Sequence, residues 1–204
     1  MKFFKWKIFM ITGIVCLLPI LFGILIWNSL PDVMAIHFNF HGTADGFAKK
    51  GFVVFGIPVM MVFFQAICCF ASDLSAKKDR NFNKLEETVS KWIIPCITVV
   101  LYVITLGYGM GWNVDMRKAC AIIVGVLFIV IGSCLSKFNR LKNIKVDAEK
   151  ARKINRFVGC LTVIWGILFL ISAFLPPIFM VVCFLLLIPY TVTTIVYTKL
   201  NIRK

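Results

Sequence analysis

Residues 28–51 read NSLPDVMAIHFNFHGTADGFAKKG and form a long polar island between two apolar segments, 8–27 and 52–72. The island contains both histidines of the chain, His37 and His41. An apolar run of about 20 residues is long enough to cross a bilayer as a helix. We therefore expect two membrane-spanning helices joined by a structured loop in this part of the chain. That loop is the part of the sequence most able to carry a chemical or recognition specificity.

Apolar runs of the same kind recur along the rest of the chain, which has 204 residues and is 60% hydrophobic. The mean hydropathy is +0.92, whereas a soluble domain is nearer half apolar. The further runs are 92–112, 119–136, 157–175 and 177–198. The pattern predicts an all-α integral membrane protein with six transmembrane helices. We expect the protein to divide into an N-terminal domain, residues 1–72, and a four-helix C-terminal part, residues 73–204.

The distribution of lysine and arginine sets the expected orientation. Of the 23 Lys and Arg residues, 19 lie in the segments 1–7, 73–91, 137–156 and 199–204. Because positively charged loops stay on the cytoplasmic side, we expect both termini in the cytoplasm and the loop 28–51 outside the cell. The membrane orientation also accounts for the net charge of +14, so no direct nucleic-acid binding is expected.

The six expected helices contain no Asp, Glu, Lys, Arg or His. Ionisable groups within a bilayer usually mark ion or proton pathways, so their absence disfavours an ion-coupled transporter. It also disfavours an intramembrane protease with paired aspartates or an HExxH motif. The eight cysteines form no CxxC or Cys/His cluster, so neither a zinc site nor a disulfide framework is indicated. We therefore expect neither an enzyme nor a cofactor.

Two pairs of glycines predict close packing between helices. Gly125 and Gly132 lie seven residues apart in the fourth apolar run, and Gly159 and Gly166 repeat that spacing in the fifth. Seven residues bring a helix back to nearly the same face, so each pair offers a groove to a neighbouring helix.

Apolar and polar residues alternate within the loop over residues 36–41. In a strand, successive side chains point to opposite faces. The expected apolar face, which would bury into the helix bundle or the lipid interface, holds Ile36, Phe38 and Phe40. The expected polar face holds His37, Asn39 and His41. Turns are expected at Gly42 and at Asp45–Gly46.

The polar face of the loop allows three interpretations. It could bind a metal through His37, His41 and Asp45, because two histidines and a carboxylate form a possible ligand set. It could perform acid–base chemistry through His37 with Asp32 or Asp45. Its groups could also hydrogen-bond the loop into one shape and present a binding surface. The third interpretation is favoured, because the spacing of these residues is not diagnostic of a metal site or of a catalytic pair.

The segment 137–156 is the second notable feature of the sequence. Read as a helix, it has an apolar stripe formed by Ile144, Ala148, Ala151, Ile154 and Val158. The basic residues off this stripe are Lys145, Lys150, Arg152, Lys153 and Arg156. A basic amphipathic helix suits the anionic inner leaflet of the bilayer, and it could equally dock an acidic or amphipathic protein.

The loop also resembles the N-terminal domain of SdpI-type bacterial membrane proteins, whose pattern is close to LPDxxPxHxNxxGxxDGxxxK. The shared positions are Leu30, Pro31, Asp32, His37, Asn39, Gly42, Asp45, Gly46 and Lys50. The usual proline of the pattern is Ala35 here, and His41 lies outside the pattern. The resemblance covers the first third of the chain well and the rest in outline.

The resemblance implies a multi-pass protein of the bacterial cell membrane that protects its cell from a secreted peptide toxin. The type protein of the family also sequesters a cytoplasmic transcriptional repressor, but the family's GIRTPWT-like segment has no equivalent between residues 131 and 159. We therefore expect an immunity protein that acts through the loop 28–51. A sensor that signals to a cytoplasmic regulator is the alternative, and a metal-dependent enzyme or a small-molecule carrier is the third.

Overall fold

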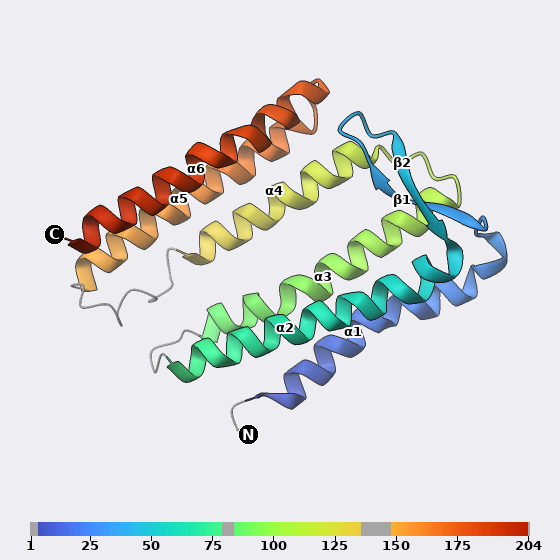
Figure 1. Cartoon of the computed structure of the whole chain (residues 1–204), viewed down its shortest axis with the longest axis horizontal. Coiled ribbons are helices and arrows are strands. Elements are labelled where there is room, and N and C mark those ends of the chain that lie inside the picture. Colours follow the sequence, from blue (N-terminus) through green and yellow to red (C-terminus); the bar gives the residue numbers. More distant parts are fainter. Residues whose placement is uncertain (1–3, 79–83, 136–147, 204) are drawn as a thin grey trace. The chain divides into compact units, whose positions relative to one another are not determined.

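The computed structural model describes residues 4–78, 84–135 and 148–203 of the chain (Figure 1). Within these residues, six helices are long and apolar enough to cross a membrane. Their bounds are α1 Trp6–Leu25, α2 Ile57–Lys78, α3 Lys84–Gly109, α4 Met116–Leu135, α5 Ala148–Ser172 and α6 Pro177–Arg203. The expected set of six helices long enough to span a membrane is confirmed, since each apolar run overlaps one helix. Four helices, α2, α3, α5 and α6, extend at least five residues beyond one end of their apolar runs.

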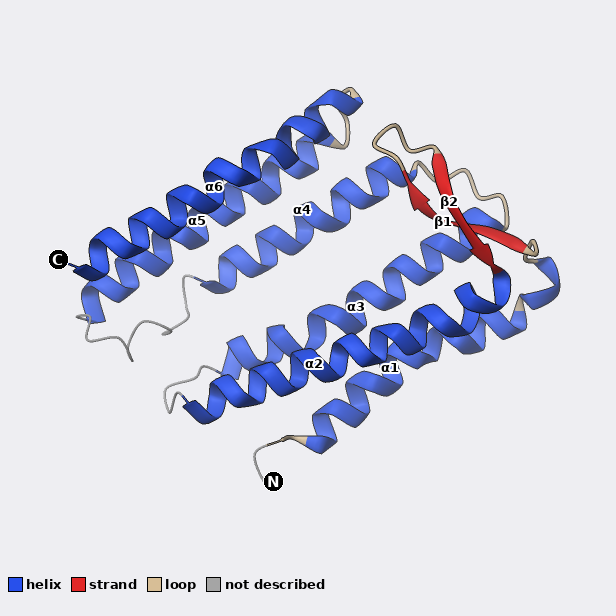
Figure 2. Ribbon diagram, in the orientation of Figure 1, coloured by secondary structure: helices blue, strands red, loops and turns tan. Residues whose placement is uncertain are grey.

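A β-hairpin interrupts the helices between α1 and α2 (Figure 2). Strand β1, Val33–Phe38, pairs antiparallel with strand β2, Ala44–Lys49. The hairpin is flanked by two short helical segments, the 3-10 helix η1 (Trp27–Ser29) and the π-helix η2 (Phe52–Gly56). The polar island of the sequence is therefore a structured element, and its structure is a hairpin rather than a single strand.

Two details expected of this loop are wrong. The apolar–polar alternation stops at Phe38, because β1 bulges between Ala35 and His37 and the chain turns after Phe38. A bulge adds one residue to a strand and so changes which side chains share a face. The pair Asp45–Gly46, expected in a turn, lies inside β2.

The chain forms two compact units. The first consists of Met1–Lys78 and Glu87–Met116, and the second of Asp79–Glu86 and Arg117–Lys204. The first unit thus combines α1, the hairpin and α2 with most of α3, and the second contains nearly all of α4 together with α5 and α6. The domain division expected at residue 72 stays a prediction.

An apolar core joins the hairpin to the helices of the first unit. Its buried members are Leu30, Met34, Val53, Val54, Tyr102 and Leu106. Tyr102 of α3 donates a hydrogen bond from its hydroxyl to the carbonyl oxygen of Val54 in η2, at 3.1 Å. A Cβ added at Gly23 of α1 would overlap this hydroxyl. The absence of a side chain at Gly23 therefore lets α1 approach α3 and η2 closely.

In the second unit, close packing of α4 on α5 confirms the role expected for the paired glycines. A Cβ added at Gly125 would lie 2.8 Å from the backbone oxygen of Gly166, and one at Gly132 would lie 2.7 Å from that of Gly159. The neighbouring atoms belong to the backbone and cannot rotate away. The two helices can therefore keep this distance only with glycine at the contact.

Candidate functional site

Asn39 organises the turn of the hairpin. Its side-chain oxygen accepts hydrogen bonds from the backbone N–H groups of His41 and Thr43, each at 3.0 Å. Its backbone N–H donates to the carbonyl oxygen of Thr43, and its carbonyl oxygen accepts from the N–H of Gly42, both at 2.9 Å. Gly42 has a φ of +84°, a left-handed conformation that glycine adopts without steric cost. One side chain and one glycine thus fix the turn.

His37 and Asp45 link the two strands. The Nδ1 atom of His37 lies 2.5 Å from Oδ1 of Asp45, across the hairpin. The residue paired with His37 in the register is Gly46, which has no side chain to obstruct the imidazole. The side chains of His37 and Asp45 are 72% and 43% exposed, so solvent screens the contact and it contributes about 0–1 kcal/mol to stability. Its main effect is to orient the two side chains.

Lys50 closes the base of the hairpin. Its backbone N–H donates to the carbonyl oxygen of Asp32 at 2.9 Å, and its ammonium group lies 2.9 Å from the Asp32 carboxylate. The same ammonium group lies 5.1 Å from the centre of the Trp27 ring, within the range of a cation–π contact. Asp32 precedes β1 and Lys50 follows β2, so these contacts hold the two ends of the hairpin together.

The underside of the hairpin rests on the end of α3. Met34 is 1% exposed, and its methyl group lies so close to Gly109 that a Cβ there would overlap it. The ring of Phe38 packs edge-on against Tyr108, with 4.9 Å between ring centres. Pro31 also contacts the end of α3 at Gly109. The hairpin is therefore seated on the helices of its own unit.

The hairpin also presents large apolar side chains that are exposed. Val33 is 57%, Ile36 42%, Phe40 54% and Phe47 60% exposed. Ile36 and Phe40 therefore do not bury into the helices of the chain, and their burial at the lipid interface stays a prediction. Exposed apolar groups on a rigid support are typical of surfaces that bind a partner.

The three residues considered as metal ligands do not come together. His37 contacts Asp45, whereas His41 lies in the turn with its ring 4.3 Å from that of Phe40. Throughout the described ranges, the structure gathers no three His, Cys, Asp or Glu residues that could hold a metal ion. The acid–base interpretation has a His–Asp contact, but both side chains are largely exposed at the surface of the hairpin.

The basic segment predicted over 137–156 is described only from residue 148, so Lys145 lies outside the described residues. Ala151 and Ile154 are 4% and 2% exposed, in agreement with the expected apolar stripe. The expected basic residues that the structure describes are all exposed: Lys150, Arg152, Lys153 and Arg156. They occupy the first turns of α5. In the described residues this stretch is helical and continues directly into the spanning part of α5, and its contact with the bilayer or with a protein stays a prediction.

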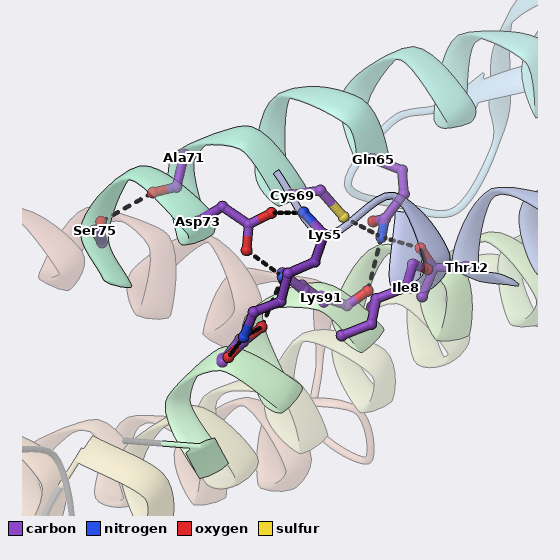
Figure 3. A network of polar contacts seen from close by, with 10 residues as sticks. Lys5, Ile8, Thr12, Gln65, Cys69, Ala71, Asp73, Ser75 and Lys91 are labelled. Atoms are coloured by element: carbon purple, nitrogen blue, oxygen red, sulfur yellow. Dashed lines mark hydrogen bonds and ion pairs between the residues drawn. The ribbon is translucent and has the colours of Figure 1, made fainter. Parts of the chain in front are cut away.

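A buried polar cluster that the sequence pattern does not predict lies at the opposite end of the first unit (Figure 3). The expected spans end at residue 72 and resume at residue 92, which places Asp73 and Lys91 in a loop. In the structure both lie inside helices, and the side chains of both are 1% exposed. The one indication of this cluster in the sequence is Gln65, a glutamine within an otherwise apolar run. A buried side-chain amide requires hydrogen-bond partners nearby.

Comparison with known proteins identifies one similarity. The family model of a domain of unknown function, DUF1648, matches residues 14–62, about a quarter of the chain. The matched residues include most of α1, the whole hairpin and the start of α2. No curated protein and no solved structure matches the chain. The region that contains the candidate site is thus similar to a domain whose function is not defined.

Proposed function

We propose that the chain protects a bacterial cell from a secreted antimicrobial peptide, and that the hairpin is the surface to which the peptide binds. The observation that carries the proposal is that the residues shared with the SdpI-type motif build the hairpin itself. Asn39 and Gly42 make the turn, His37 and Gly46 pair across the strands, and Lys50 closes the base.

The hairpin is suited to binding because its shape is fixed in advance. A preorganised surface loses little conformational freedom on association, so more of the contact energy remains as affinity. Exposed aromatic side chains are the residues that most often dominate such contacts. Phe40 and Phe47 are 54% and 60% exposed on the hairpin. They are the proposed anchors for an apolar or amphipathic peptide.

The proposed orientation places the hairpin outside the cell, where a secreted peptide first meets the membrane. Its support is the sequence, in which 19 of the 23 Lys and Arg residues lie in the segments 1–7, 73–91, 137–156 and 199–204, since positively charged segments stay on the cytoplasmic side. In this proposal the protein is a multi-pass protein of the bacterial cell membrane. It acts by binding, without a catalytic step and without a cofactor.

Survival curves test the proposal. The protein is produced in a sensitive Gram-positive host, which is exposed to a panel of secreted antimicrobial peptides alongside the same host with an empty vector. Protection is expected against at least one peptide, and the His37→Ala variant is expected to lose it while reaching the membrane in equal amount. Wild-type protein that is present in the membrane but protects against no peptide would contradict an immunity function.

A second candidate function is a sensor that passes the binding signal to a cytoplasmic transcriptional repressor. The observation that favours it is the exposed basic face on the first turns of α5, formed by Lys150, Arg152, Lys153 and Arg156. One of these, Lys153, pairs with Glu149 at 2.8 Å. Such a face can bind an acidic protein or the anionic lipid bilayer.

Charge reversal distinguishes the sensor from the lipid contact. Changing Arg152 and Arg156 to Glu is expected to abolish toxin-dependent gene expression and to leave survival unchanged if a regulator binds there. If survival and expression fall together while less protein reaches the membrane, the basic face serves the bilayer and the sensor is excluded.

A further inference from the structure

The end of the first unit away from the hairpin contains a buried ion pair between α2 and α3. The Nζ atom of Lys91 lies 2.5 Å from Oδ1 of Asp73 and 2.8 Å from Oε1 of Glu87 (Figure 3). The side chains of Lys91 and Asp73 are each 1% exposed, and that of Glu87 is 12% exposed. An ionisable group in such a position is stable only with its partner in place, because a single buried charge is strongly unfavourable.

The start of α1 is fastened to both carboxylates. The backbone N–H of Lys5 donates to Oδ2 of Asp73 at 2.9 Å, and the Lys5 ammonium group lies 2.7 and 2.6 Å from the two oxygens of Glu87. Asp73 belongs to α2 and Glu87 to α3. One residue at the beginning of α1 thus joins three helices, and its own side chain is 49% exposed.

A second group of polar contacts lies further along the same helices. The amide nitrogen of Gln65 lies 2.8 Å from the hydroxyl of Thr12, 2.8 Å from the carbonyl oxygen of Lys91 and 3.2 Å from Sγ of Cys69. Gln65 and Thr12 are both 0% exposed. These contacts again join α1, α2 and α3 through one side chain.

Apart from these contacts, α1 buries only small or compact side chains. Its buried residues are Thr12, Gly13, Cys16, Pro19 and Gly23. Several of its large residues face outward: Leu17, Leu18 and Leu21 are 37%, 50% and 61% exposed. Between helices in a bilayer the hydrophobic effect gives little drive for association, because lipid chains are as apolar as leucine. Polar contacts therefore decide how firmly this end of α1 is held.

The two ends of α1 are held by different means. At the hairpin end, the apolar core around Tyr102 and Leu106 encloses the connection between α1 and the hairpin. At the other end, Lys5 and Thr12 make the polar contacts described above. The contacts at one end share no side chain with those at the other.

We propose that Lys5, Asp73, Glu87 and Lys91 form a latch that closes the N-terminal end of α1 onto α2 and α3. The latch is closed when all four charges are present and opens when one of them is lost. Opening separates this end of α1 and uncovers Gln65 and Thr12, while the hairpin end stays assembled. The latch is a conformational device independent of what the hairpin binds.

Distances between spin labels measure the two ends separately. Labels are attached through a genetically encoded ketone amino acid, which leaves the native cysteines intact, and the full chain is studied in lipid nanodiscs. One pair, at Met10 and Ser75, reports the latch end, since both positions are exposed on α1 and α2. The other pair, at Leu25 and Val59, which are 83% and 58% exposed, reports the hairpin end. Each pair is measured in the unaltered chain and in each variant.

Three substitutions of lysine on α1 and its flank provide matched comparisons. Lys5→Met is expected to broaden the Met10–Ser75 distribution and shift it to longer distances, with the Leu25–Val59 distribution unchanged. Lys5→Arg keeps the charge and can bind both oxygens of Glu87, so the narrow distribution should persist. Lys7→Met removes an exposed lysine two residues further along the chain. This variant should also keep the narrow Met10–Ser75 distribution.

Lys91→Met gives the stronger perturbation, because it leaves the buried carboxylate of Asp73 without the ammonium group that balances its charge. The latch end is expected to open more than in Lys5→Met, again with the hairpin end unchanged. If Lys91→Met does not fold, the comparison of Lys5→Met with Lys5→Arg decides the question alone. A Met10–Ser75 distribution that stays narrow in Lys5→Met overturns the latch. Simultaneous broadening at both ends overturns it too, because the four charges would then stabilise the whole unit.

Discussion

Gly46 lies directly opposite His37 in the hairpin, and a Cβ added at position 46 would lie 2.8 Å from the Cβ of His37. The histidine can therefore cross the strand pair toward Asp45 only because its neighbour has no side chain. This relationship explains in physical terms why the motif needs a glycine after the aspartate. It also shows that two motif residues, His37 and Gly46, depend on each other for the same local shape.

Gly46→Ala is accordingly expected to loosen the hairpin. Overpacking of this kind costs about 1–3 kcal/mol, which lowers the amide protection of β2 by about fivefold or more in hydrogen exchange. Gly51→Ala is the matched control, because a Cβ there meets its nearest neighbour, Trp27, at an ordinary 3.9 Å. Equal protection in the two variants would show that the close approach at His37 is relieved without cost.

Asn39→Ala is expected to loosen the turn by removing the acceptor for two backbone N–H groups. The hydrogen bonds from His41 and Thr43 lie at an exposed site, where water replaces them, so the expected loss is about 1 kcal/mol. Exchange of the Thr43 amide should accelerate by about fivefold to tenfold. Asn39→Asp keeps a side-chain oxygen as the acceptor, so the Thr43 amide of this variant should exchange at the wild-type rate. If Asn39→Asp exchanges as fast as Asn39→Ala, the side-chain oxygen does not fix the turn.

Gly132→Ala is expected to destabilise the second unit although alanine is the better helix former. The intrinsic preference favours alanine by about 1 kcal/mol, but the added methyl would lie 2.7 Å from the Gly159 oxygen and 2.8 Å from the Val163 nitrogen. These backbone atoms can move only if α4 and α5 separate. A lower thermal unfolding temperature is expected, whereas Val126→Ala, at a side chain 47% exposed, should change it little. An unchanged or higher temperature in Gly132→Ala would contradict the close α4–α5 contact.

The six helices could be predicted because long uncharged runs have few alternatives in a membrane protein. The glycine contacts of α4 and α5 were also predictable, since a seven-residue spacing returns to one helix face. Strand β2 was not predicted, because Asp45 and Gly46 are typical turn residues and their place in a strand depends on the long-range pairing with His37. Such pairing is invisible in a local pattern.

The buried cluster escaped prediction for a different reason. A charged residue at the edge of an apolar run is normally taken as the end of the helix, yet α2 continues to Lys78 and α3 begins at Lys84. Asp73 and Lys91 are tolerated inside because each neutralises the other at 2.5 Å. The two residues can be buried only as a pair, so neither residue alone predicts in the sequence that it lies inside a helix bundle.

Binding of a toxic peptide by the exposed face of the hairpin is tested most directly by survival with a matched pair of phenylalanine variants. Phe47→Ser removes an exposed ring from the hairpin, and Phe63→Ser removes one that is 63% exposed on α2. Both variants must reach the membrane in wild-type amounts. Phe47→Ser is expected to lower the lethal peptide concentration by about tenfold or more, which corresponds to a loss of about 1.4 kcal/mol or more of binding free energy, while Phe63→Ser protects like the wild type. Full protection by Phe47→Ser, or equal loss in both variants, would contradict peptide binding by this face of the hairpin.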